Sequence, residues 1–413
     1  MPDSGLKLDV AIVGGSFAGL ALAIALDRCF GSDVKVAIVE RRDVDRAAPS
    51  APDPRAFAVA EGSRLLLEAL GVWWRVAADA QPVTGIDITD SSLEAVSRPV
   101  LLSYDNCVEG VAQSHIVDAG RLEAALLASA RACPGVGWIA PGELRSMDAT
   151  ASFARLEVDG FGTLSARLVV AADGAGSKLR NLSGIGVTRL AFQQTGIVTT
   201  VAHEKPHEGR AVQHFLPAGP FAMLPLKGDR CCITWSEDSA RAREILALPD
   251  DLFLEEVQQR AGWHWGEMQL VGPRRSWPLE GMLAREIVRG RVALIGDAAR
   301  SVHPIAGQGL NLGLRDVAAL AEAIADGLRL GLDAGDATLL ALYQSWRRFD
   351  NVQSSAAFGT LNGLFSSDSS LLRSVRDAGL GLVDRLDGLK ALLVSEAAGH
   401  VGDVPRLLHG QLP

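Results

Sequence analysis

The sequence predicts an α/β fold in which a doubly wound domain is interrupted by an inserted, mainly antiparallel-sheet domain and followed by C-terminal helices. Residues 8–40 predict a strand, a glycine turn, a helix and a second strand, the order that gives parallel pairing. Residues 187–275 instead alternate short strands with proline and glycine turns, which is typical of antiparallel sheets. The first pattern returns at residue 291, so the second unit is predicted to be an insertion.

Composition limits the class of protein. The chain has 413 residues, of which 48% are hydrophobic and 22% charged, and its net charge is −9. This length can bury more than one core, and the acidic balance with scattered basic residues argues against a nucleic-acid partner. Five cysteines without CxxC spacing predict reduced thiols rather than a disulfide framework or a metal site. The pair Cys231-Cys232 is expected in a strand.

No segment predicts a membrane span. The longest uncharged run, residues 10–26, is shorter than the roughly 20 residues that a spanning helix needs, and glycines interrupt it. The first residues do not have the pattern of a signal peptide. We therefore expect a cytoplasmic protein, and peripheral contact with the inner face of the cytoplasmic membrane stays open.

The first predicted turn has the pattern of a dinucleotide site. Small residues there let the backbone approach a pyrophosphate, and the start of the next helix offers the phosphates a positive field. Glu40 ends the following strand, where a carboxylate accepts hydrogen bonds from an adenosine ribose, and Arg41 and Arg42 either assist it or face solvent. A serine replaces the middle glycine of GxGxxG, so a plain packing turn is the alternative. The turn consists of Gly14, Gly15, Ser16, Phe17, Ala18 and Gly19.

Two further corners place an aspartate at the end of an apolar strand. Asp173-Gly174 follows the run LVVAA, and Gly296-Asp297 follows the run VALI. Each could be a strand-to-helix turn with an aspartate cap. Three such corners in one chain are harder to explain separately, and they suggest that one ligand lies against all of them.

The three corners, in this order, resemble the fingerprints of flavoprotein aromatic hydroxylases of the p-hydroxybenzoate hydroxylase type, which surround one FAD. Within that family the sequence is similar to the hydroxylases of ubiquinone biosynthesis. The resemblance covers essentially the whole chain. The strings that carry it are HPIAGQGLNLGLRD at 303–316, HFLPAGPFAMLPL at 214–226, and RRFDN with LNGLFS in 347–366.

The resemblance implies a p-hydroxybenzoate hydroxylase-like fold with a doubly wound FAD-binding domain and an inserted substrate domain. Each domain would be assembled from separate stretches of the chain. The expected segments are 1–80, 106–186 and 276–340 for the FAD-binding domain, 81–105 and 187–275 for the substrate domain, and 341–413 for the C-terminal helical region.

The resemblance also implies an FAD-dependent monooxygenase that hydroxylates the ring of a polyprenylated phenol in ubiquinone biosynthesis. NAD(P)H would be a transient electron donor, because no second dinucleotide fingerprint is present, and O₂ would be the co-substrate. A flavin C4a-hydroperoxide would deliver oxygen to the ring. The alternatives are a related FAD monooxygenase acting on another aromatic or alkene substrate, and a non-catalytic FAD-containing scaffold of the quinone-synthesis assembly.

By the same resemblance, Glu40 would hold the adenosine ribose and Arg121 would reach the pyrophosphate region, with an exposed helix ion pair as the alternative for Arg121. The backbone of 307–311 would face the isoalloxazine ring, and the helix that begins there would stabilise negative charge on it. Arg300 departs from the family pattern, which often has His at this position. The full set of FAD-binding candidates is Gly14, Gly15, Ser16, Phe17, Ala18, Gly19, Glu40, Arg41, Arg121, Asp173, Gly174, Gly296, Asp297, Pro304, Gly307, Gln308, Gly309, Leu310 and Asn311.

Substrate residues are expected on the inserted sheet, and core packing is the alternative for them. No phenol-activating base is evident. Only His303 and Pro304 are candidates for a chemical role, and loop hydrogen bonding is the alternative for His303. The substrate-binding candidates are His214, Phe215, Phe221, Met223 and Pro225.

A prenylated substrate would carry a long apolar tail, which favours work at a membrane face or inside an assembly of ubiquinone-biosynthesis proteins. The C-terminal region offers apolar helix faces for such contact, and packing against the FAD-binding domain is the alternative. A homo-oligomer also stays open. The residues concerned are Leu364, Phe365, Leu371, Leu372, Leu386, Leu389, Leu392 and Leu393.

Overall fold

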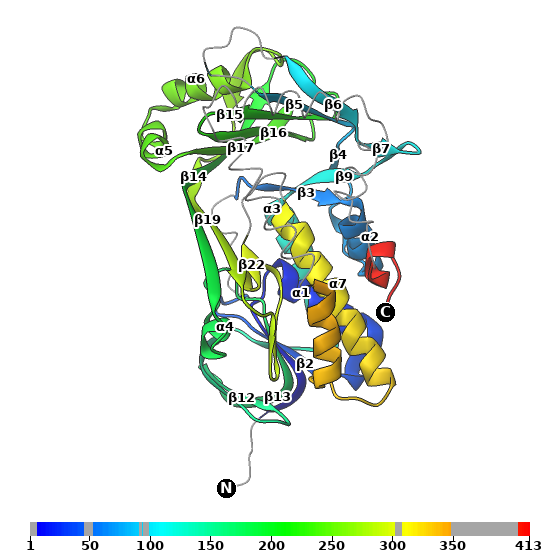
Figure 1. Cartoon of the computed structure of the whole chain (residues 1–413). Coiled ribbons are helices and arrows are strands. Elements are labelled where there is room, and N and C mark those ends of the chain that lie inside the picture. Colours follow the sequence, from blue (N-terminus) through cyan, green and yellow to red (C-terminus); the bar gives the residue numbers. More distant parts are fainter. Residues whose placement is uncertain (1–5, 45–52, 91–92, 94–98, 302–307, 348–403) are drawn as a thin grey trace.

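A computed structural model describes residues 6–44, 53–90, 93, 99–301, 308–347 and 404–413. Two large sheets, a small three-stranded sheet and a short hairpin form the β structure (Figure 1). The nine-stranded sheet lies at one end of the molecule in this view, and the eight-stranded sheet lies toward the other end. The mixed α/β class that the sequence predicts is confirmed.

The eight-stranded sheet is the doubly wound part of the chain. Four neighbouring strands in the order β10-β2-β1-β13 are parallel, and β21 continues the parallel pairing beside β13. Their sequences are nearly continuous apolar runs because helices and strands bury both faces. The strands are β1 (Leu6–Val13), β2 (Val36–Val39), β10 (Val136–Ile139), β11 (Glu143–Ala149), β12 (Ala154–Asp159), β13 (Gly162–Ala171), β20 (Val288–Arg289) and β21 (Val292–Leu294).

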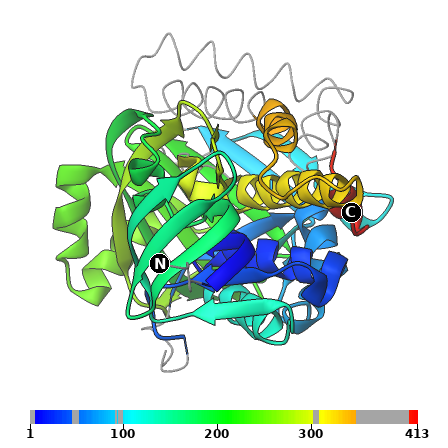
Figure 2. The same ribbon diagram turned by 90° about the horizontal axis from the view of Figure 1, so that it is seen from below.

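Helices of the first unit pack around α1. Figure 2 shows α1 in blue beside α7 in yellow, and α1 also contacts α3. Together with the sheet they form the largest hydrophobic core. None of the helices that the structure describes is long and apolar enough to cross a membrane. The helices are α1 (Phe17–Phe30), α2 (Glu61–Ala69), α3 (Ala119–Arg131), α4 (Lys178–Leu182) and α7 (Gln308–Arg329), with short 3-10 turns at η1 (Gly31–Asp33), η2 (Trp73–Arg75), η3 (Gly296–Ala298) and η5 (Arg406–His409).

The nine-stranded sheet is antiparallel except where β15 runs parallel to β5. Two helices cover one of its faces and close the second hydrophobic core. The predicted strand at Cys231-Cys232 is confirmed as part of β17, where both thiols are fully buried. The elements are β5 (Gly85–Asp90), β6 (Val100–Asp105), β14 (Val187–His203), β15 (Arg210–Leu216), β16 (Gly219–Leu226), β17 (Arg230–Asp238), β18 (Met268–Leu270), β19 (Arg275–Ala284), β22 (Arg300–Ser301), α5 (Ser239–Leu246) and α6 (Asp250–Ala261).

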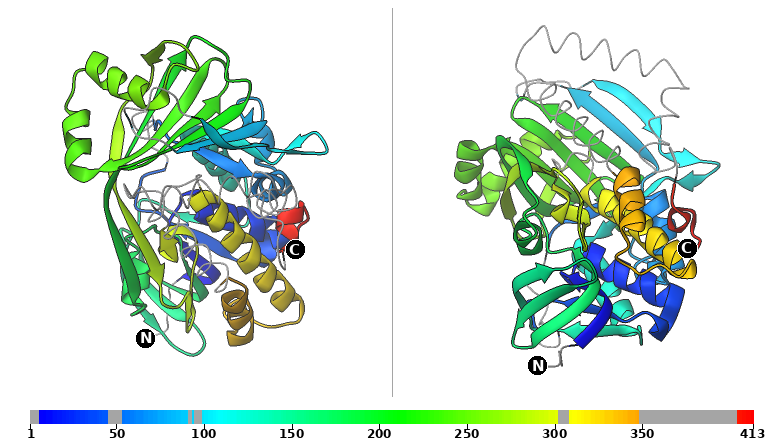
Figure 3. Two further views of the ribbon diagram at one scale, coloured as in Figure 1. Left: turned by 45° about the horizontal axis from the view of Figure 1, so that its top comes forward. Right: turned by 60° about the horizontal axis from the view of Figure 1, so that its bottom comes forward.

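A long strand connects the two units. β14 has 17 residues, and Figure 3 shows the β14–β19 pair extending along one side of the molecule. Its register shifts between Ala191 and Gln194, and Gln193 there has a φ of 55°, as expected for a bulge that bends a strand. Because β19 pairs with β14 and β22 pairs with β19, the second sheet extends into residues 276–301, which the sequence assigns to the FAD-binding domain. The predicted domain boundaries themselves stay a prediction.

Small β elements lie between the large sheets. β3 (Ala56–Ala60), β9 (Ser114–Asp118) and β4 (Gln81–Pro82) form the three-stranded sheet, and β7 (Cys107–Val108) pairs with β8 (Val111–Ala112). A third apolar cluster joins β3 and β9 to one face of β15 and β16. This contact holds the inserted sheet above the first unit.

Part of the C-terminal region is described. Residues 337–347 are helical, and η5 packs on α2 and α7. Arg406 in η5 forms ion pairs with Glu322 and Asp326 of α7. The C-terminal leucines predicted for membrane or partner contact lie outside the described residues.

Candidate functional site

The first corner is a glycine turn between β1 and α1. Gly14 has a φ of 112°, and a Cβ there would lie 2.3 Å from the carbonyl oxygen of Ala172. A Cβ on Gly19 would lie 2.0 Å from the Gly14 oxygen. Ser16 precedes α1 without a side-chain cap, and no acidic residue lies in the first turn. The helix start therefore keeps its backbone N–H groups available to an anion.

Glu40 is buried beside this turn. Its Oε2 accepts a hydrogen bond from the Gly15 N–H at 2.7 Å, and its Oε1 accepts from the N–H and Nε of Arg42. The Arg42 guanidinium also donates to the Gly15 oxygen and to Glu123. Arg42, the neighbour of Arg41 in the predicted set, thus closes over the turn through these hydrogen bonds, although both arginines are exposed. A carboxylate accepts about four hydrogen bonds, so Glu40 retains capacity for a ribose hydroxyl.

The second corner follows β13. The Asp173 carboxylate accepts hydrogen bonds from the N–H groups of Lys178 and Leu179, and from the Ser177 hydroxyl. Asp173 therefore caps the start of α4, which is the alternative that the sequence left open. Gly174 follows with a φ of 81°, a conformation that favours glycine. A contact between this corner and a flavin nucleotide stays a prediction.

Arg180 of α4 connects the second corner to the third. Its side chain is fully buried, and its guanidinium donates to the carbonyl oxygens of Ala175 at 2.9 Å and Ala298 at 3.0 Å. Burial lowers the pKa of Arg180. No carboxylate of the described residues forms an ion pair with Arg180, so the carbonyl dipoles of Ala175 and Ala298 stabilise its charge. The two loops are thereby fixed to each other.

The third corner follows β21. Gly296 has a φ of 59°, and its N–H donates to Asp316 of α7 at 2.9 Å. A Cβ on Gly296 would lie 3.3 Å from the Ala18 methyl, so this corner lies against the start of α1. Asp297 keeps an exposed surface, but the protein atoms around its carboxylate displace part of its hydration. This desolvation raises the pKa of Asp297, and the charges of Arg300 and Arg55 oppose the rise.

The start of α7 is tied to β3. The Asn311 side chain accepts from the Ala60 N–H at 2.9 Å and donates to the Ala58 oxygen at 2.8 Å. Asn311 and Leu310 are buried, whereas Gln308 and Gly309 are half-buried. Asn311 therefore anchors the helix through its side chain. Of the predicted set, His303, Pro304 and Gly307 lie outside the described residues.

The three corners converge in space. Gly14 lies against Ala172 of the second corner, Ala18 lies against Gly296 of the third, and Arg180 joins the second corner to the third. This arrangement fits a dinucleotide with a flat ring. The uncapped start of α1 at the first corner offers N–H groups to phosphates, and the buried Glu40 carboxylate beside it can bind a ribose. A glycine at each of the three corners lets a ligand approach the backbone.

A model of the FAD-binding domain family matches residues 7–352 of this sequence. The chain belongs to this family. Ubiquinone hydroxylase UbiL of Rhodospirillum rubrum is 38% identical over 412 residues, which cover 97% of this chain and 92% of the relative. The 3-demethoxyubiquinol 3-hydroxylase of Escherichia coli is 30% identical over 402 residues, which cover 95% and 98%.

Solved structures show the same fold. The p-nitrophenol 4-monooxygenase PnpA of Pseudomonas putida has a TM-score of 0.78 at 20% identity, covering 97% of this chain and 100% of that chain. PqsL of Pseudomonas aeruginosa has a TM-score of 0.73 at 22% identity, covering 91% and 99%. The predicted p-hydroxybenzoate hydroxylase-like fold and membership of the flavoprotein monooxygenases are confirmed. FAD is the cofactor of this family.

In this FAD-binding chain the described contacts of Arg121 are with Asp79 and Asp118, which do not belong to the three corners. Its side chain is 61% exposed and forms an ion pair with Asp79, while its backbone N–H is capped by Asp118. The structure thus shows the exposed helix ion pair that the sequence left as the alternative. A contact between Arg121 and the pyrophosphate would require the side chain to leave Asp79.

The substrate-binding candidates divide between the two faces of the inserted sheet. Phe221 and Met223 are 0% and 2% exposed and belong to the core beneath α5 and α6. The His214 ring stacks on Phe221, and Pro225 pairs with Cys231 of the same core, so both share that covered face. Side chains alternate along a strand, which leaves Phe215 on the opposite face.

For Phe221 and Met223 this placement shows the core packing that the sequence left as the alternative, and a substrate contact by this set stays a prediction. Phe221 and Met223 are core residues, since helices cover their face of the sheet. The opposite face of the neighbouring strand turns toward the FAD-binding domain, because Cys232 Sγ donates to the Pro54 oxygen at 3.3 Å. The sequence located the strand of the inserted sheet but not the face of that strand that turns toward the FAD-binding domain. In GPFAMLPL both faces carry apolar side chains, so no alternation marks one face as covered by helices.

Several connecting residues were missed by the sequence analysis. Arg180 and Asp316 are fully buried, and Arg55 packs between the rings of Phe57 and Trp277. Each of these residues is charged, and a charged residue in a helix or loop is predicted to lie at the protein surface unless its partner is known. Their positions in the sequence could have indicated a role at the site, because Arg180 ends the second motif and Asp316 ends the HPIAGQGLNLGLRD string.

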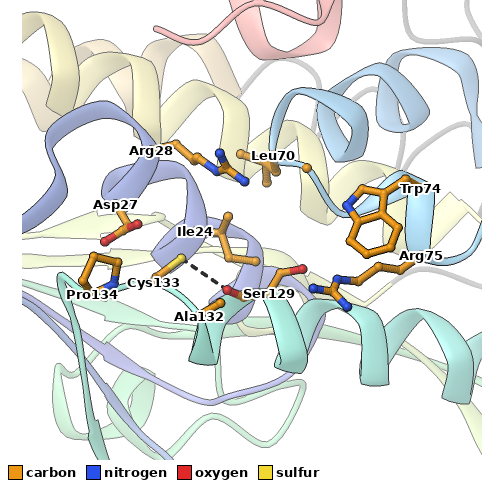
Figure 4. Close-up of a pocket in the computed structure, with 11 residues that line it drawn as sticks. Ile24, Asp27, Arg28, Leu70, Trp74, Arg75, Ser129, Ala132, Cys133 and Pro134 are labelled. Carbon is orange, nitrogen blue, oxygen red and sulfur yellow. Dashed lines mark hydrogen bonds between the residues drawn. The ribbon is translucent and has the colours of Figure 1, made fainter.

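A cavity of about 330 Å³ lies away from the three corners (Figure 4). It is lined by the last turns of α1 and α3 and by the residues after α2, including Arg28, Trp74 and Arg75. The Cys133 thiol at its edge donates to the Ser129 oxygen, and burial raises the pKa of Cys133 to about 12. The thiol is therefore unreactive near neutral pH. None of the residues that line this cavity belongs to the three corners.

Proposed function

We propose that this chain hydroxylates the aromatic ring of a prenylated phenol in ubiquinone biosynthesis. The observation that carries the proposal is the 38% identity to the Rhodospirillum rubrum ubiquinone hydroxylase along 97% of the chain. The convergence of the three corners supports it, because ring hydroxylation by this family requires an FAD. NAD(P)H is the proposed electron donor and O₂ the proposed co-substrate.

The corners supply the residues that would hold the cofactor. The α1 start with Gly14 and Gly15 would bind the pyrophosphate, and Glu40 would bind the adenosine ribose. Asp297 would accept hydrogen bonds from the hydroxyls of the flavin chain, and Arg55, whose charge acts on Asp297, would face the phosphates. When bound, FAD supplies the two-electron reduction and oxygen activation that no side chain can perform.

The substrate ring is proposed to lie under the face of the inserted sheet that carries Phe215. Strand pairing places Ala222 beside Thr234 on that face, and Trp277 pairs opposite Gly196 on the neighbouring strand. Trp277 also contacts the Arg55 guanidinium, whose centre lies 5.7 Å from its ring. These residues would orient the ring and exclude water, which protects the reactive cofactor. No catalytic base is proposed.

Gene deletion followed by extraction of quinone intermediates tests the proposal. We expect a prenylated phenol lacking one ring oxygen to accumulate, and the intact gene to restore the quinone. An unchanged quinone pool would refute this function and favour a related monooxygenase acting on another substrate. Assays of the purified protein separate the scaffold alternative, because a non-catalytic scaffold would show no flavin reoxidation coupled to formation of hydroxylated product.

Membrane and partner contacts are part of the same proposal. A substrate with a long apolar tail is delivered most directly from a membrane face, and the apolar C-terminal residues are the candidates for that contact. Liposome flotation of the full chain, compared with a chain ending after residue 366, tests this. Flotation that does not change on truncation would contradict the assignment.

A further inference from the structure

A buried ion triad lies behind the Gly296–Asp297 corner. Asp316 Oδ2 accepts from Arg300 Nη1 at 2.6 Å, and its Oδ1 accepts from Arg347 Nε at 2.8 Å. The side chains of all three residues are between 0% and 4% exposed. Solvent and salt screen such charges little, so they act on neighbouring groups more strongly than surface pairs do.

The same triad holds the backbone on one side of Asp297. The Gly296 N–H donates to Asp316 Oδ2, which also accepts from Arg300. On the other side, Arg180 binds the Ala298 oxygen. Asp297 therefore lies between two anchored peptide groups. The hydrogen bonds of Gly296 and Ala298 fix the backbone of Asp297 and thereby limit where its carboxylate can lie.

Three charged groups act on the Asp297 carboxylate. Arg300 in its own segment and Arg55 before β3 both lower the pKa of Asp297, whereas Asp316 on α7 raises it. Withdrawal from water is the largest influence and also raises the pKa of Asp297. The triad therefore contributes both signs of charge to this position.

We propose that Asp316, Arg300 and Arg347 are positioning residues that fix the Asp297 carboxylate and set its charge for FAD binding. The inference rests on the proposed function, because it takes Asp297 as a contact of the bound FAD. It assigns to Arg300, which departs from the family pattern, a permanent positive charge that does not titrate near neutral pH.

Two substitutions separate charge from structure. Asp316→Asn removes a negative charge with little change in shape, so Asp297 should lose its proton at lower pH. Arg300→Met removes a positive charge from the same triad, so Asp297 should lose its proton at higher pH. Loosened packing would weaken binding in both variants but has no reason to move the two midpoints in opposite directions. Arg300→Lys keeps the charge and is the matched control.

The measurement is the FAD dissociation constant of the apoprotein as a function of pH, followed by flavin fluorescence. Asp297→Asn identifies the transition, because only the Asp297 step should be lost from its profile. We expect the Asp316→Asn midpoint below that of the parent chain, the Arg300→Met midpoint above it, and Arg300→Lys close to it. We also expect about tenfold weaker FAD binding by Asp316→Asn, because the Gly296 N–H loses a charged acceptor.

Midpoints that move in the same direction, or a parent profile identical to that of Asp297→Asn, would overturn the inference. If Asp316→Asn does not fold, the comparison of Arg300→Met with Arg300→Lys decides, since equal midpoints for these two would also overturn it. A parent chain that fails to bind FAD would overturn the proposed function itself. A parent chain that binds FAD and hydroxylates substrate, without opposed midpoints, would overturn only this inference.

Discussion

Replacing Gly14 by alanine is expected to destabilise the first corner more than replacing the adjacent Gly15. The φ of 112° lies in a region that side chains rarely adopt. The new Cβ would also lie 2.3 Å from the Ala172 oxygen and 2.8 Å from the Asp173 nitrogen. Both atoms belong to the backbone, so no side-chain rotation relieves the overlap.

The magnitude follows from these two effects. A residue held in such a strained backbone conformation costs about 1–3 kcal/mol. Forcing an extra methyl into close-packed surroundings costs about 1–3 kcal/mol more. Gly14→Ala should therefore lower the free energy of unfolding by about 2–6 kcal/mol. It should also weaken FAD binding, because β1 and β13 must separate where the second corner begins.

Chemical unfolding of the apoprotein, followed by far-UV circular dichroism, measures this change without a contribution from bound cofactor. Gly15→Ala is the matched control. A Cβ there would lie 3.1 to 3.3 Å from side-chain atoms of Glu40, which are its three nearest neighbours, and would overlap no backbone atom as closely as at Gly14. We therefore expect a smaller cost of about 1 kcal/mol. Equal unfolding midpoints for the two variants would refute the argument from backbone overlap.

Three further outcomes are expected. Asn311→Ala should cost about 2–4 kcal/mol of unfolding free energy, because it leaves a buried N–H and a half-buried carbonyl of β3 unpaired; an unchanged denaturation midpoint would contradict this. Arg180→Ala should cost about 2–5 kcal/mol and weaken FAD binding, with Arg180→Lys intermediate, as measured by unfolding and flavin fluorescence. Burial lowers the pKa of His203, so stability should be fully present above its ordinary pKa of about 6.5 and fall as the pH drops toward the folded value; unfolding midpoints across this range, with His203→Gln as the control that loses part of the dependence, test the sign.

The backbone of the site was predictable because it depends on local patterns. A strand that ends in glycines or in an aspartate can be read from a few residues, and all three corners were found in this way. The turn at Gly14 and the positive φ of Gly296 are conformations that glycine permits and other residues rarely adopt.

The side chains that join the corners were not predictable. Arg180 reaches a carbonyl 118 residues away, and Asn311 reaches a strand 251 residues away. Nothing in the sequence near either residue indicates these partners. The same limit explains Phe221 and Met223, because a strand with apolar residues on both faces does not reveal which face a helix will cover.

The bond from Arg180 to Ala298 has a consequence for synthesis of the chain. It closes a loop that contains β14 to β19 of the nine-stranded sheet, and the anchor from Asn311 to β3 encloses residues 60–311, which also include β5 and β6. Closing such long loops is slow relative to the folding of any one strand pair. A nascent chain therefore has no complete cradle for its yellow cofactor until residue 311 has emerged from the ribosome, and flavin uptake marks the end of assembly rather than its beginning.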